Sequence, residues 1–293
     1  MSKIKHSMWY LGLVLMANSA LSQEQKGMGE NHGPLSDPKW QLIDDFEAKD
    51  SVASWIKADT KNETKPFVAN PQVTKRLTEK LKGNSNSYML KKAAQEGVIG
   101  NRKALTFKAL PQIVEVGETY TFYTRINVES FPNNHAFGLS NMGPEDIKKH
   151  DYNAFEATLR VTDKRESSGL KNTGALMVKV PGGYANVKHN LAKNERDAKP
   201  LESGQWYQIW YVVNNAPKEQ GGQTYDVYLQ GGRAFPEQTL VYKNASFRMQ
   251  REWPLTYFLM NCNTGPLDKP YGNGGLKYDD IYMTKGIELT NPS

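Results

Sequence analysis

Cysteine is almost missing from this sequence of 293 residues, which contains only Cys262. A single cysteine excludes an intramolecular disulfide, so the fold has to be held by its own hydrophobic core. No run reaches the roughly 20 apolar residues that a membrane-spanning helix needs. The sequence also has no zinc-ligand spacing, no RNA-binding signature and no stripe of Lys and Arg, which argues against a nucleic-acid partner.

The segment 1–22 has the pattern of a secretory signal peptide. Lys3 and Lys5 precede an apolar run over residues 8–16, and small residues follow up to Ser22. We therefore expect cleavage near Ser22 and a bacterial protein that is secreted or periplasmic. Removal of Lys3 and Lys5 lowers the formal net charge from +6 to +4, a mildly basic value that suits an anionic partner.

Beyond the signal peptide, we expect a disordered lead-in over residues 23–39 and one monomeric domain over residues 40–293. Most of the domain reads as short segments rich in β-branched and aromatic residues, several of them separated by Gly-Gly pairs. Six such segments are 119–128, 154–161, 175–180, 206–213, 224–229 and 255–260. Only 70–82 and 144–150 could form a helical turn or two. The fold class is therefore all-β, an antiparallel two-sheet β-sandwich.

Two neighbouring strands resemble a hairpin of the concanavalin A-like lectin and glucanase superfamily, whose members are jelly rolls. The segment 204–207 reads Gly-Gln-Trp-Tyr, and 225–231 reads Tyr-Asp-Val-Tyr-Leu-Gln-Gly. Segments 42–47 and 277–283 resemble the first and last strands of such jelly rolls, which usually pair with each other. The resemblance implies a jelly roll that acts on or binds polysaccharide. Lectins, hydrolases, lyases and binding modules share this fold, so it leaves the activity open.

Within that superfamily, the jelly-roll alginate lyases and related uronan lyases give the nearest functional resemblance. Tyr257 and Phe258 resemble the start of their penultimate sheet strand, and Glu156 and Arg160 loosely resemble a pair on an earlier strand. Their Gln-x-His strand has no counterpart in this sequence. The resemblance implies cleavage of an anionic, uronic-acid-containing glycan by β-elimination.

Strand alternation separates a polar from an apolar face around Arg160. Glu156 and Arg160 share one face, and Phe155, Ala157 and Leu159 are expected on the other. Arg160 can bind a uronate carboxylate through two parallel hydrogen bonds, which neutralises the charge that opposes proton abstraction at C5. The alternative is a cross-strand ion pair between Glu156 and a lysine.

His135 and Tyr257 are the proton-transfer candidates that complete a catalytic set with Arg160. A tyrosine phenol can protonate the leaving glycosidic oxygen or, when deprotonated, take the C5 proton. The alternatives are a solvated histidine at a turn and aromatic rings that stack on sugar faces. The candidates for substrate binding are Glu156, Lys179, Tyr184, His189, Trp210, Asn261, Asn263 and Tyr271.

Two other functions stay open at this point. A non-catalytic carbohydrate-binding protein would use Trp210 and other aromatic residues as stacking platforms, and an envelope or adhesion component would need no sugar chemistry. A hydrolase would need two carboxylates that flank the scissile bond. The glucanase-like E-x-D-x-x-E strand is absent, which argues against hydrolysis.

Acidic residues near both ends of the domain suggest a structural calcium site. Asp45 and Glu47 would lie close to Asp279 if the terminal strands pair, and Ca²⁺ prefers such an oxygen-rich environment. Jelly-roll carbohydrate modules often carry a calcium ion there, which the resemblance implies here as well. The alternative is a set of acidic residues at exposed strand ends. No other cofactor is expected.

Overall fold

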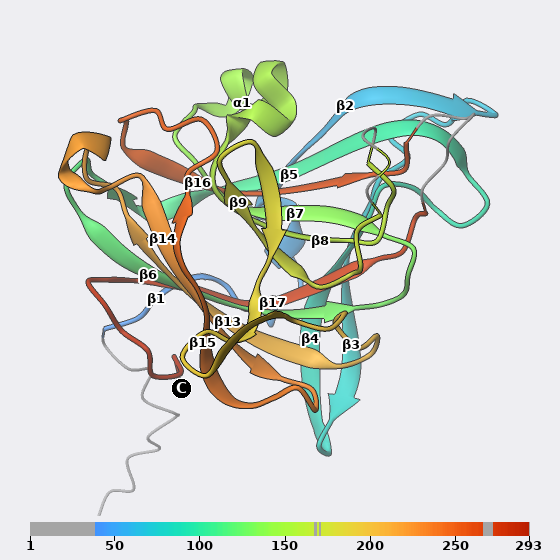
Figure 1. Ribbon diagram of the computed structural model, residues 1–293. Coiled ribbons are helices and arrows are strands. Elements are labelled where there is room, and N and C mark those ends of the chain that lie inside the picture. Colours follow the sequence, from blue (N-terminus) through green and yellow to red (C-terminus); the bar gives the residue numbers. More distant parts are fainter. Residues whose placement is uncertain (1–38, 167–168, 170, 266–271, 293) are drawn as a thin grey trace, which may run out of the picture. The chain divides into compact units, whose positions relative to one another are not determined.

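Two large antiparallel sheets lie face to face in the computed structural model, which describes residues 39–166, 169, 171–265 and 272–292 (Figure 1). The predicted signal peptide, and the predicted lead-in except for Lys39, lie outside the described residues. The predicted fold class is confirmed: the described chain forms an antiparallel two-sheet jelly-roll sandwich. In the described ranges, no helix has the length and apolar character needed to cross a membrane.

The sheet that we call the back sheet has eight strands. Seven follow one another in the order β15 (Phe235–Ser246), β14 (Thr224–Gly231), β13 (Trp206–Asn214), β6 (Thr119–Val128), β17 (Leu276–Lys285), β4 (Asn84–Lys92) and β3 (Val73–Leu81). The eighth, β1 (Gln41–Asp44), pairs with β17. The strands β1 and β17 therefore pair, as the resemblance to jelly rolls implies.

The second large sheet, which we call the front sheet, has seven strands. Their order is β10 (Gly183–Asn186), β9 (Leu176–Val180), β8 (Phe155–Thr162), β7 (Asn134–Ser140), β16 (Leu255–Asn263), β5 (Ile99–Val114) and β2 (Ile56–Lys65). A small sheet joins β11 (Lys188–Asn190) to β12 (Asn194–Asp197). The helical elements are η1 (Ser51–Ser54), α1 (Pro144–His150), η2 (Asp151–Ala154) and η3 (Lys218–Gln220). Each of the six segments predicted as strands forms one.

The segment 70–82 differs from the prediction, because it forms strand β3 instead of a helical turn. β3 pairs with β4 without a break, from Val73 opposite Lys92 to Leu81 opposite Asn84. Lys82 and Gly83 at the reversal have φ values of 49° and 87°. Two residues with positive φ make a tight hairpin whose twist matches that of the flanking strands. Cross-strand pairing therefore outweighs any local preference for a helix.

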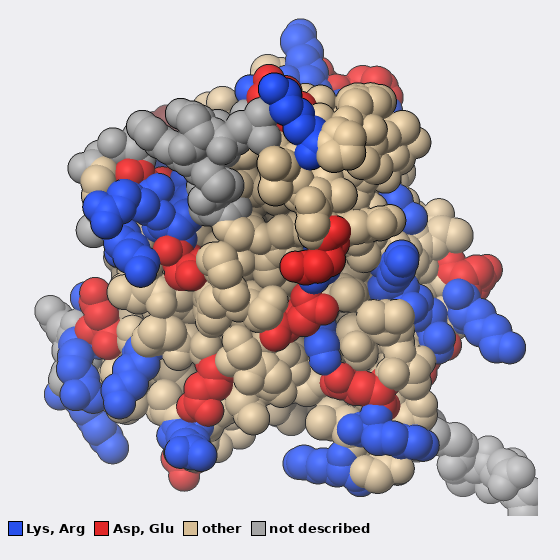
Figure 2. Space-filling model, turned by 90° about the vertical axis from the view of Figure 1, so that its right-hand side faces the viewer, with Lys and Arg blue, Asp and Glu red and all other residues tan. Residues whose placement is uncertain are grey.

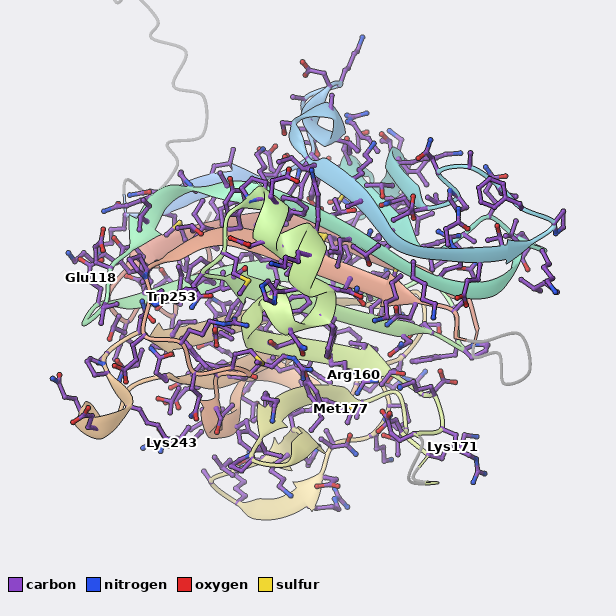
Figure 3. The ribbon with its side chains drawn as sticks, turned by 90° about the horizontal axis from the view of Figure 1, so that it is seen from above. Glu118, Arg160, Lys171, Met177, Lys243 and Trp253 are labelled. Carbon is purple, nitrogen blue, oxygen red and sulfur yellow. The ribbon has the colours of Figure 1, made fainter. Side chains whose placement is uncertain are left out.

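The main hydrophobic core fills the space between the two sheets. The rings of Phe122 and Tyr211 stack there with centroids 5.5 Å apart. A second, smaller cluster lies on the outer face of the front sheet, where Ile147 of α1 packs with Phe107 and Leu259. α1 and η2 therefore cover part of that outer face, as Figure 3 shows.

Strand β8 contains an irregularity that simple alternation does not predict. Gly138 of β7 lies opposite Thr158, but Ser140 lies opposite Phe155, so β8 has one extra residue in this interval. The prediction that Phe155 shares a face with Ala157 is therefore wrong. Phe155 packs in the cluster under α1, whereas Ala157 belongs to the main core.

The surface carries charges of both signs. In the face shown in Figure 2, Lys and Arg side chains are interspersed with Asp and Glu side chains. Surface pairs such as Lys61 with Glu63 and Lys188 with Asp197 lie 3.2 and 2.8 Å apart. Exposed pairs of this kind contribute little to stability, typically about 0–1 kcal/mol.

Candidate functional site

A pocket of about 640 Å³ lies on the outer face of the front sheet, beside η2. Its floor is a row of cross-strand neighbours: Met177 lies opposite Arg160, Arg160 opposite Ala136, and Ala136 opposite Asn261. Ala136 is small, so it leaves space between the longer side chains beside it. Figure 3 labels Arg160 and Met177 on this part of the sheet.

The walls come from the segments that connect or flank these strands. The turn between β9 and β10 supplies residues 181–182, the start of β10 supplies Gly183 and Tyr184, and η2 supplies Tyr152. The connection from β8 to β9 supplies Lys164, Glu166 and Asn172. The pocket therefore combines a rigid sheet floor with loop walls, the common plan of binding sites on β-scaffolds.

Arg160 is held in a defined orientation in this pocket. Its side chain is largely buried, Nη1 lies 3.1 Å from Oε1 of Glu166, and Nη2 donates a hydrogen bond of 3.1 Å to Oδ1 of Asn134. Its guanidinium carbon lies 5.1 Å from the centre of the Tyr184 ring. A planar guanidinium fixed in this way is suited to bind a carboxylate.

Two tyrosines form a hydrogen-bonded pair in the same pocket. The hydroxyl of Tyr152 donates to the hydroxyl of Tyr184 at 2.8 Å. Burial raises the pKa of Tyr184 well above its ordinary value. The Tyr184 phenol is therefore protonated at neutral pH and is better suited to give a proton than to take one.

The amides of β16 line the pocket with unmatched acceptors. Oδ1 of Asn261 and Oδ1 of Asn263 are buried and receive no hydrogen bond from the described residues. Leaving a buried polar atom without a partner costs free energy. A ligand hydroxyl that reached either oxygen would remove that cost, so these positions favour a ligand rich in hydroxyl groups.

His135, predicted as a catalytic residue, does not reach the pocket. It alternates with Ala136 on β7, so its ring points to the opposite face, toward the interior of the sandwich. The ring is 2% exposed and its Nε2 lies 2.9 Å from the carbonyl oxygen of Gly274. Burial lowers the pKa of His135 to about 3. The ring is therefore neutral and enclosed.

Tyr257, the other predicted proton-transfer residue, lies on β16 away from the pocket lining. Its ring packs against Phe107 with centroids 5.7 Å apart, in the cluster that α1 covers. Asn261 is four residues further along the strand, a distance of about 13 Å at the usual rise of a β-strand. The structure thus separates Arg160, His135 and Tyr257, which were predicted to act together.

The predicted substrate-binding residues divide into three groups. Tyr184, Asn261 and Asn263 line the pocket with Arg160. Lys179 lies beside it, with Nζ 5.9 Å from the centre of the Tyr184 ring. The others are elsewhere: the indole of Trp210 is buried on the back sheet and donates to the carbonyl of Thr290, His189 packs against Phe235, and Tyr271 lies outside the described residues.

Glu156 is enclosed by protein groups and does not face the pocket opening. It is fully buried, and its carboxylate accepts hydrogen bonds from the backbone N–H groups of Met249, Gln250 and Arg251. Nη1 of Arg251 lies 2.9 Å from Oε1. The carboxylate that was predicted to bind substrate, or to pair with a lysine, instead fixes the segment before β16.

The three predicted calcium ligands already have protein partners. Asp279 pairs with Arg125 at 2.9 Å, and the two carboxylate oxygens of Glu47 accept from the backbone N–H and hydroxyl of Ser87. Oδ1 of Asp45 accepts from the backbone N–H of Glu47. In the part of the chain that the structure describes, no group of three or more His, Cys, Asp or Glu side chains is arranged to hold a metal ion. Arg125 supplies the positive charge there.

No family model and no curated protein matches the sequence. Solved structures with a similar chain path include the globular domain of T. cruzi calreticulin, at 12% identity over 85% of this chain and 87% of that one, with a TM-score of 0.43. The lectin UEA-II in complex with galactose is 10% identical over 86% and 100% of the two chains, with a TM-score of 0.43. A PL-14 alginate lyase from Aplysia kurodai is 12% identical over 72% and 87%, with a TM-score of 0.44.

At identities of 10–12% and TM-scores of 0.43–0.44, these likenesses do not indicate a ligand or an activity, so the residues of the pocket have to indicate the function. Sequence reasoning found Arg160, Tyr184, Asn261 and Asn263 but missed most of the other residues of the lining, among them Tyr152, Asn134 and Glu166. Tyr152 follows the predicted helical turn at 144–150, and its position just before a strand is the one signal that could have pointed to it.

We predict that Glu156→Gln lowers the free energy of unfolding by about 1–3 kcal/mol, because it removes the charge that the three N–H groups and Arg251 surround. Urea unfolding measures the loss. The control is Glu145→Gln, which removes an exposed carboxylate paired with Lys148 and should change stability by about 0.5 kcal/mol or less. Equal stability of the two variants would show that the carboxylate does not hold this segment.

The buried His135 should make stability depend on pH. In the unfolded chain a histidine has a pKa of about 6.5, whereas in the folded protein burial lowers the pKa to about 3. Between these values the unfolded chain binds more protons, so stability falls as the pH is lowered from about 6.5 toward 3, by at most about 1.4 kcal/mol per pH unit.

The free energy of unfolding, measured at several pH values between about 3 and 6.5, should therefore change less steeply with pH for His135→Gln than for the wild type. The exposed His150 provides the control, because His150→Gln should keep the wild-type slope. The comparison uses slopes, so a general loss of stability in His135→Gln does not affect it. An unchanged slope in His135→Gln would contradict the prediction.

Proposed function

We propose that the pocket binds a uronic-acid residue of an anionic polysaccharide and that the protein cleaves the chain by β-elimination. The observation that supports this most directly is the fixed guanidinium of Arg160 beside the hydrogen-bonded pair of Tyr152 and Tyr184. Arg160 would neutralise the uronate carboxylate and so make the C5 proton more acidic. We further infer export from the signal-peptide pattern of residues 1–22.

A proton relay through the two tyrosines would balance the reaction. Tyr184 gives its proton to the leaving glycosidic oxygen and receives the proton of Tyr152, whose oxygen takes the proton from C5. The C4–O4 bond breaks as the C4–C5 double bond forms. Neither tyrosine ends with a changed charge, which suits a pair whose environment keeps Tyr184 protonated.

The alternative is a lectin-like protein that binds the same glycan without cleaving it. The placement of His135 favours this alternative, because its ring is enclosed and no other histidine lies in the described lining of the pocket. Binding would need only Arg160, the amides of β16 and the tyrosine rings. The two functions therefore share one pocket and differ in whether the tyrosine pair transfers protons.

Incubation of the purified protein with alginate, polygalacturonate and ulvan tests the proposal, since elimination creates a conjugated double bond that absorbs in the ultraviolet. We expect Arg160→Gln to lower the affinity, measured by calorimetry, about 10-fold or more, because a charge-assisted pair is lost. The exposed Arg233 gives a matched control, and Arg233→Gln should keep wild-type affinity.

The tyrosine variants separate cleavage from binding. Tyr152→Phe and Tyr184→Phe should bind nearly as well as the wild type but release little product, because each keeps the ring and loses the transferable proton. Binding by the wild type without any product would establish the lectin-like alternative. No affinity for any of the three polysaccharides, or wild-type affinity in Arg160→Gln, would reject the pocket as a uronate site.

A further inference from the structure

Two cations beside the pocket have no carboxylate partner among the described residues. Lys179 on β9 donates a short hydrogen bond from Nζ to the carbonyl of Val180, and Arg248 donates to Oδ1 of Asn153 at 2.8 Å. Neither side chain forms an ion pair in the described ranges, although nearby Arg251 is paired with Glu156. The positive charges of Lys179 and Arg248 are therefore not compensated locally.

Both cations lie against the tyrosine pair of the pocket. The guanidinium carbon of Arg248 is 4.4 Å from the centre of the Tyr152 ring, and Nζ of Lys179 is 5.9 Å from the centre of the Tyr184 ring. Arg160 also packs on the Tyr184 ring. The tyrosine pair therefore contacts Arg160 as well as Lys179 and Arg248. Ring contacts alone are weak partners for two like charges.

The pairing of β8 with β9 makes Lys179 a diagonal cross-strand neighbour of Arg160. Arg160 lies opposite Met177, and Lys179 is two residues further along β9 on the same face. Diagonal neighbours of this kind are about 7–8 Å apart at the backbone. This spacing leaves room for Lys179 to bind a different group from the carboxylate bound by Arg160.

The two charges also oppose each other. Burial lowers the pKa of Lys179, and the positive charge of Arg248 lowers it further. Nε of Arg248 is buried and has no hydrogen-bond acceptor among the described residues. Two neighbouring cations that repel, with a donor left over, are stabilised when an anion binds between them.

We propose that Lys179 and Arg248 form a second anion subsite, which binds a carboxylate or sulfate on the sugar next to the one that Arg160 holds. This inference rests on the proposed function, because the first anion is the uronate in the pocket. It narrows the substrate class to glycans that carry a negative charge on consecutive sugars. A chain charged on every second sugar would fill only one of the two subsites.

Two soluble probes distinguish these classes: polygalacturonate, which is charged on every sugar, and hyaluronan, which is charged on every second sugar. The double variant Lys179→Gln/Arg248→Gln should bind polygalacturonate about 100-fold more weakly, since each cation contributes about 10-fold. Its affinity for hyaluronan should change less than about 3-fold, because the second subsite is empty there. The affinity for polygalacturonate should also depend less steeply on salt.

Lys243→Gln is the matched control, because it removes a positive charge from β15, which Figure 3 shows well away from Arg160. It should keep wild-type affinity for both glycans. Equal weakening of both glycans in the double variant, or none, would overturn the second subsite. Loss of binding in Arg160→Gln with no change in the double variant would reject this inference alone, whereas no binding by the wild type would reject the proposed function itself.

Discussion

The packing of the two sheets against each other is the constraint on which the remaining features depend. Every second residue of an interior strand must be apolar to fill the space between the sheets, so the residues between them are free to be polar on the outer face. Ala157 and Leu159 meet this demand on β8 and so direct Arg160 outward. The same alternation turns His135 inward on β7, because Ala136 lines the pocket.

The outer face of the front sheet is not left open along its whole length. α1 and η2 pack on it through Ile147 and Ala154, and the extra residue in β8 turns Phe155 up to meet them. The carboxylate of Glu156 follows directly and fixes the segment that leads into β16. One bulge thus supports both the cover over the sheet and the loop that carries Arg248. The pocket beside η2 lies on a part of this face that these elements leave uncovered.

The sequence predicts the parts of this structure that alternation and turn residues determine. It predicts the all-β sandwich and the polar face of β8 that carries Arg160, whereas the pairing of the first and last strands follows from the resemblance to jelly rolls. It does not predict the bulge at Phe155, because one extra residue in a strand leaves no mark on the apolar pattern. It also does not predict the surroundings of Tyr257, which packs partly buried against the cluster under α1, or of Trp210, which the chain near Thr290 covers. Tertiary covering of this kind depends on segments distant in sequence.

The cations near the pocket differ in whether a carboxylate lies beside them. Glu156 pairs with Arg251, whereas Glu166 shares its charge between Arg160 and Lys164, and each carboxylate also accepts a hydrogen bond from an amide. Stability alone would favour a carboxylate partner for Lys179 and for Arg248 as well, since unpaired neighbouring cations lower stability when they are partly buried. Their lack of acidic partners among the described residues therefore lowers the stability of the folded protein, and no contact within the described residues compensates for it. A ligand that brings its own negative charges offsets that cost only when it is bound, which links the affinity of the site to the charge spacing of the glycan.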